Sequence, residues 1–102
     1  MTEKKKMTQQ LGVRIPDSLE PVYANLIKIS HADDEVTLTF LHKIPETNLA
    51  QGRAIVTITP QHAKRLLRAL STNLKRYEAT YGEIKLPEDG SGREEKSNVE
   101  VA

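Results

Sequence analysis

The sequence predicts an α+β fold: a small antiparallel sheet of three or four strands packed on one C-terminal amphipathic helix, with flexible N- and C-terminal tails. Three observations indicate this class. A segment that starts after Thr59 repeats apolar residues at helical spacing. Before it, strand-forming segments alternate between apolar and polar side chains. Both ends of the chain are polar and hold little material for a core.

The helix has clear signals at both of its ends. Thr59 is a good N-cap, because its hydroxyl accepts a hydrogen bond from a free backbone N–H of the first turn. Pro60 suits the first helical position, where no N–H is needed. Gly82 can take the left-handed conformation that closes a helix. These signals predict a helix of about 22 residues between Thr59 and Gly82, roughly 33 Å long.

One face of this helix is apolar. Its members recur at spacings of three and four residues and fall within an arc of roughly 100–120°. This apolar helix face comprises Ala63, Leu66, Leu67, Leu70, Leu74, Tyr77 and Tyr81. A face this regular either packs on a sheet or pairs helices between subunits. Because about three heptads are near the lower limit for a free coiled coil, packing on the sheet is the favoured use.

The opposite face of the helix is positively charged. Only the uncharged Thr72 and Ala79 interrupt it. This basic helix face comprises Lys64, Arg65, Arg68, Lys75 and Arg76. The simplest interpretation is a solvated surface, since an amphipathic helix needs a polar side. The alternative is a site for an anionic partner, either nucleic acid or an acidic protein segment.

Three strands are expected before the helix. Residues 22–31 are rich in strand formers, and an irregularity at Asn25-Leu26 suggests either a bulge or a strand with both faces partly covered. Residues 35–44 alternate cleanly, and residues 53–58 run almost directly into the helix cap. Residues 11–15 also alternate and are compatible with a short leading strand. The expected order is therefore β-β-β-α, with or without a first β.

The turn at residues 32–34 makes the first two strands an antiparallel hairpin, and residues 45–51 form the next loop. The helix covers only one face of such a sheet. The other face is semi-polar and carries Thr37, Thr39, Leu41, Ile55 and Thr57. That face, or an open sheet edge, suits contact with a second copy of the chain.

The domain boundaries follow from composition. Residues 1–14 are expected to be a flexible tail, residues 15–86 a single α+β domain, and residues 87–102 a disordered polar tail. The foldable part is small and holds few aromatic residues, so it is only marginally stable alone. The 102-residue chain has no cysteine, which excludes disulfides and thiolate metal sites. We therefore expect the chain to gain stability by forming a homodimer or higher oligomer.

Few residues carry chemistry. Three histidines occur: His31 beside Asp33-Asp34 in a turn, His42 on a strand, and His62 in the first helical turn. None has the spacing of a metal site, and structural roles are favoured for all of them. No catalytic arrangement and no phosphate-binding loop is present, so we expect a non-enzymatic protein without cofactor or metal. The net charge of +1 gives no overall attraction to nucleic acid or membrane, and no apolar run is long enough to span a bilayer, so a cytoplasmic location is expected.

Several short runs resemble a known family. They are Tyr23-Ala24-Asn25, Asp34-Glu35-Val36 ahead of Phe40, Pro60-Gln61-His62-Ala63-Lys64-Arg65-Leu66-Leu67-Arg68-Ala69-Leu70, Asn73-Leu74, Tyr77-Glu78 and Gly82-Glu83-Ile84. Over about Glu20 to Pro87 the chain resembles a family of short bacterial and archaeal proteins of unknown function, uncharacterised-domain family 3467. The resemblance implies a single-domain, non-secreted protein and brings no activity, cofactor or catalytic residue.

Three functions remain open at this stage. The favoured one is a small non-enzymatic oligomerising or protein-binding, adaptor-like domain, because the core is small and catalytic groups are missing. The second is a nucleic-acid-associated protein that uses the basic helix face. The third is a holdase-like chaperone whose oligomer exposes apolar grooves.

Overall fold

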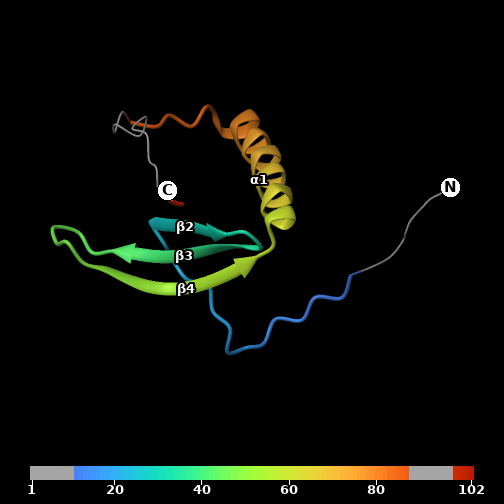
Figure 1. Cartoon of the computed structure of the whole chain (residues 1–102). Coiled ribbons are helices and arrows are strands. Elements are labelled where there is room, and N and C mark those ends of the chain that lie inside the picture. The colour runs from blue at the N-terminus through green and yellow to red at the C-terminus, as the bar shows by residue number, and fades with distance from the viewer. Residues whose placement is uncertain (1–10, 88–97) are drawn as a thin grey trace.

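The computed structural model describes residues 11–87 and 98–102. In chain order they form β2 (Leu26–Ala32), β3 (Glu35–Lys43), β4 (Ala50–Ile58), α1 (Pro60–Tyr81) and β5 (Val99–Val101). The four strands make one antiparallel sheet in the order β4-β3-β2-β5. Figure 1 shows the sheet with the helix rising from one of its ends. The predicted α+β class is therefore confirmed.

The predicted hairpin is present, and its register sorts the side chains onto two faces. Ala32 pairs with Glu35 across the two-residue turn Asp33-Asp34. The cross-strand partners of Leu38 are Ile29 and Val56, so these apolar side chains share one face. The other face is semi-polar, as expected. There the hydroxyls of Thr37 and Thr57 lie 3.2 Å apart.

The bulge lies elsewhere than the sequence suggests. At Asn25-Leu26 the pairing with β3 is unbroken, because the N–H of Asn25 donates to the carbonyl of Leu41 at 3.0 Å. The irregularity is between β3 and β4, where Phe40 pairs with Ala54 and Leu41 with Gly52. Arg53 is the extra residue. The bulge therefore bends β4, while β2 stays regular.

The C-terminal tail requires a correction. Residues 87–102 were expected to be a disordered tail, yet Val99–Val101 form β5 and pair with β2. Ile27 and Ala102 extend this ladder by exchanging both backbone hydrogen bonds, at 2.9 and 2.7 Å. No strand forms at residues 11–15. The rest of the two expected tails, residues 1–10 and 88–97, lies outside the described residues.

Both predicted ends of the helix are confirmed. The hydroxyl of Thr59 accepts from the N–H of His62 at 3.1 Å, and Pro60 takes the first helical position. Gly82 ends the helix with φ +106°, and its N–H donates to the carbonyl of Glu78 at 2.9 Å. The carboxylate of Glu78 then accepts from the N–H of Ile84 at 2.9 Å. This last bond fixes the chain as it leaves the helix.

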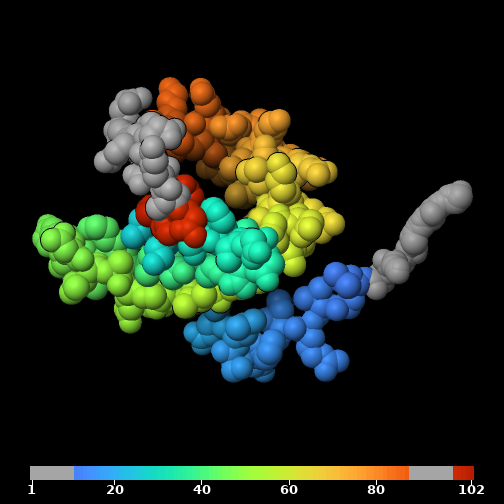
Figure 2. All heavy atoms as spheres, viewed as in Figure 1, coloured from blue at the N-terminus to red at the C-terminus, as the bar shows by residue number. Residues whose placement is uncertain are grey.

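The helix covers little of the sheet. Only Thr59 separates β4 from α1, and so short a link gives the chain little room to turn back over the strands. Among the strands, α1 contacts chiefly β3, and Figure 2 shows the base of the helix meeting the sheet. As a result, no residue in the described ranges is fully buried. The two layers are present as predicted, but they do not enclose a core by themselves.

Candidate functional site

The apolar helix face is solvent-exposed in the single chain. Its central leucines, Leu66, Leu70 and Leu74, keep 41%, 52% and 42% of their surface exposed. Tyr77 is 48% exposed, and its ring lies 4.9 Å from that of Tyr81 at a tilt of 46°. Of the seven members of this face only Ala63 is half-buried. The helix thus presents an apolar stripe over most of its length without a partner on it.

The sheet is no better covered. Along β3 the residues from Val36 to His42 are half-buried, and on β4 Val56 remains 42% exposed. The whole chain has an accessible surface of 9060 Å², whereas a compact monomer of this mass has about 5,800 Å². Residues 11–22, which lead away from the sheet in Figure 1, contribute part of the excess.

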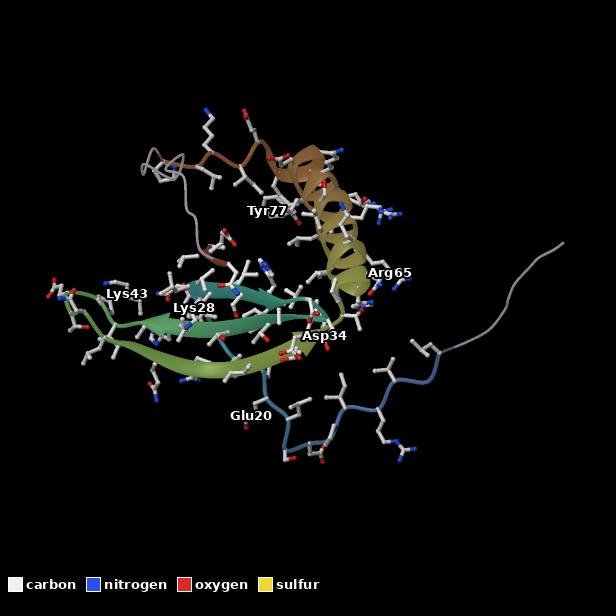
Figure 3. All side chains as sticks on the ribbon, in the orientation of Figure 1. Glu20, Lys28, Asp34, Lys43, Arg65 and Tyr77 are labelled. Atoms are coloured by element: carbon white, nitrogen blue, oxygen red, sulfur yellow. The ribbon has the colours of Figure 1, made fainter. Side chains whose placement is uncertain are left out.

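The basic helix face points the other way. In Figure 3, Tyr77 lies on the side of α1 that looks over the sheet, and Arg65 projects from the opposite side. All five cations are exposed, and in the part of the chain that the structure describes none of them forms an ion pair. A shallow open hollow on this face is lined by Arg65, Arg68, Ala69 and Thr72. The hollow exists because the small Ala69 lies between longer side chains.

The three histidines lie on three different elements, β2, β3 and α1. His42 is half-buried, and the ring of Tyr23 lies edge-on to it, with centroids 5.8 Å apart and an interplanar angle of 82°. His31 is exposed near the hairpin turn, and His62 is exposed in the first turn of α1. Within residues 11–87 and 98–102, no group of three or more acidic or histidine side chains is placed to hold a metal ion.

The interactions that sequence reasoning missed are structural. The side-chain amide of Asn25 bonds the backbone of Lys43, and the hydroxyl of Thr47 organises the β3–β4 loop through the carbonyl of Ile44 and the N–H of Leu49. Asn25 belongs to one of the short runs that carry the family resemblance, which was the available signal. Thr47 gave none, because a threonine in a polar loop is unremarkable in sequence.

The helix that the structure describes is neither long enough in apolar residues nor apolar enough overall to cross a bilayer.

The comparisons with known proteins identify a family and no more. Residues 1–86 match the family model described as "Protein of unknown function (DUF3467)". The match begins earlier than the resemblance read from Glu20 onward, and it covers the sheet strands β2 to β4 and the whole helix. No curated protein and no solved structure matches the chain.

Proposed function

The chain belongs to the DUF3467 family, and we propose that it is a non-enzymatic protein-binding module that works as a homodimer joined through the apolar helix face. The observation that supports this most strongly is that no described residue is fully buried in the single chain. A domain of this size needs a core to offset the entropy of folding, because burial of apolar surface is the main favourable contribution. A second copy supplies the missing half of that core.

The amount of open apolar surface suits a dimer. A stable complex buries about 800 Å² on each partner, and the exposed members of the apolar helix face run along most of a 22-residue helix. The exposed side chains are also of the right kind. Obligate homodimer interfaces are apolar and rich in aromatic residues, as is the stripe from Leu66 to Tyr81.

We further propose that the two helices pair antiparallel. Each helix starts at the end of its own sheet and rises away from it (Figure 1), so parallel pairing would bring both sheets to the same end. Antiparallel pairing places the partner's sheet beside the uncovered C-terminal half of α1 and opposes the two helix dipoles. It also sets the small Ala63 across from the large Tyr77, with Leu70 near the two-fold axis at the middle of the helix.

The dimer is tested by light scattering coupled to size-exclusion chromatography. The wild-type protein is expected to have twice the mass of the 11.5 kDa chain at tens of micromolar. Leu70→Asp should shift it to monomer, because a charge on the interface would be desolvated without a partner. Arg68→Asp, the matched control on the opposite face, should leave the dimer intact. A monomeric wild-type protein with cooperative, concentration-independent unfolding would refute the proposal.

The orientation is tested by disulfide trapping, for which a cysteine-free chain is ideal. A disulfide forms only where two Cα atoms come within about 7 Å. Leu70→Cys should cross-link to its own copy, and a mixture of Ala63→Cys and Tyr77→Cys chains should give the mixed product. Cross-linking of Ala63→Cys or Tyr77→Cys each to its own copy would show parallel helices instead.

The same samples distinguish the proposed dimer from a holdase-like chaperone. A holdase would suppress the aggregation of an unfolded client protein through its exposed apolar face. In a dimer that buries the face, we expect no such suppression by the wild-type protein. Suppression that Leu70→Asp abolishes, in a protein that runs as a monomer, would favour the chaperone.

A further inference from the structure

We infer that the basic helix face binds the phosphate backbone of duplex nucleic acid, without reading its sequence. This site is separate from the proposed dimer contact. The five cations lie on the arc opposite the apolar helix face, so they stay in solvent whether or not a second copy is bound. The choice of a duplex over a membrane surface rests on the proposed dimer, which covers the apolar helix face.

The first observation is that these charges are not placed where they would stabilise the helix. A helix is stabilised by acidic residues in its first turn and basic residues in its last turn, and α1 has neither. Instead Lys64 and Arg65 lie close to the positive N-terminal end. In the described part of the chain, none of the five cations forms an ion pair with a carboxylate. The positive potential of the helix end thus adds to that of the side chains, which favours an anion bound there.

The second observation is the hollow around Ala69. Arg65, Arg68 and Thr72 line it together with Ala69, so two arginines and one hydroxyl-bearing residue come from the same stretch of the basic helix face. These are donors that suit phosphate oxygens, and guanidinium groups bind them in a bidentate manner. The shape is open, as expected for a group carried on a long polymer. An enclosed pocket would instead suit a small free molecule.

The third observation is length. From Lys64 to Arg76 the cations span twelve residues, or about 18 Å of a rigid helix. Duplex DNA carries one charge per about 1.7 Å of its axis, so several phosphates come within reach of this row. We expect three to five to be neutralised. Because the row is straight and rigid, little entropy is lost when it binds.

The partner is a duplex for a physical reason. Single-stranded nucleic acid is held largely by stacking its bases on aromatic rings. Here Tyr77 and Tyr81 lie on the apolar helix face, away from the cations. A membrane surface would need that apolar face to enter the lipid. In the proposed dimer that face is covered by the second copy.

Acidic residues near the start of the helix direct the choice of variants. Asp33 and Asp34 form the hairpin turn at the end of the sheet from which α1 starts, as Figure 3 shows for Asp34. Their charge opposes phosphate binding near Lys64. Arg68 and Lys75 lie farther along the helix from this turn than Lys64 does, so they are the cations changed in the test.

The experiment measures binding of a fluorescent 20-base-pair DNA duplex to the full chain by anisotropy. Wild-type protein should bind saturably at 50 mM salt and weaken by about 40- to 500-fold at 200 mM, from a slope of about 0.9 per phosphate for three to five contacts. Arg68→Glu with Lys75→Glu should reduce binding at 50 mM at least tenfold. The matched control, Lys28→Glu with Lys85→Glu, changes the net charge equally but away from this face and should reduce it far less.

Circular dichroism and light scattering of the same variants confirm that helix and dimer are retained. The inference is overturned if the duplex does not bind at 50 mM salt, or if the two double variants weaken binding equally. It is also overturned if single-stranded DNA binds more tightly than the duplex. Binding to vesicles of anionic phosphatidylglycerol, with none to the duplex, would assign the face to a membrane instead.

Discussion

Asn25 holds the main chain of Lys43 through both ends of its side-chain amide. Its Oδ1 accepts from the N–H of Lys43 at 2.7 Å, and its Nδ2 donates to the carbonyl of Lys43 at 3.3 Å. The side chain thereby adds two hydrogen bonds beyond the last paired residues of β2 and β3. Asn25 itself lies just before the start of β2. A single residue ahead of β2 thus closes the open end of the hairpin.

Asn25→Ala should therefore destabilise the protein by about 1–3 kcal/mol, because two backbone groups of Lys43 lose their partner. Urea unfolding at a fixed protein concentration measures the change. Asn48→Ala is the control, since Asn48 is an exposed residue of the following loop. Equal unfolding midpoints for the two variants would show that the Asn25 bonds contribute nothing measurable.

Leu74→Ala should cost about 2–5 kcal/mol when the protein is dimeric, as for truncation of a buried leucine. In the single chain Leu74 is 42% exposed, so the cost should shrink when dilution separates the copies. Arg68→Ala should stay within about 0.5 kcal/mol at every concentration. Denaturant midpoints measured over a hundredfold range of concentration test this dependence. A Leu74→Ala cost that does not vary with concentration would place this leucine in a core of the single chain.

Removal of residues 98–102 should loosen the edge of β2. These residues form β5, and the exchanged backbone bonds between Ile27 and Ala102 would be lost with it. Hydrogen exchange should then become faster at the amide of Ile27, with little change at Thr39 in the middle of the sheet. Unchanged protection at Ile27 would mean that β5 does not pair stably in solution.

Gly82→Ala should destabilise the helix end by about 1–3 kcal/mol, because φ +106° is strained for a residue with a side chain. Space is not the obstacle, since an added Cβ would meet no atom within 4 Å. Gly52→Ala is the matched control: it has equal room and no positive φ, and we expect it to be tolerated. Thermal melts of both variants provide the comparison.

The sequence could predict features that depend on residues close together in the chain. Thr59 and Gly82 act on backbone groups within a few residues, so the helix ends were read correctly. Alternation along residues 35–44 gave the two faces of the sheet, because side chains in a strand must alternate. By contrast, β5 pairs with a strand about seventy positions away, and three residues in a polar segment carry no periodicity that reveals it.

The candidate surfaces show the same limit. The membership of the apolar and basic helix faces follows from helical spacing alone, given the helix. Helical spacing does not reveal how much of the apolar helix face is covered. That depends on the direction in which the chain leaves β4. The one-residue link at Thr59 decides that direction, and it leaves Leu66, Leu70 and Leu74 uncovered.

The bulge in β4 has a consequence for the solution behaviour of the protein. β4 is a nine-residue edge strand of the sheet. The unpaired backbone groups of an edge strand are a template on which further chains can add and grow into fibrils. The extra residue at Arg53 breaks the regular hydrogen-bond spacing at mid-strand and adds a charge there. The bulge and the charge therefore hinder the addition of a further strand at β4.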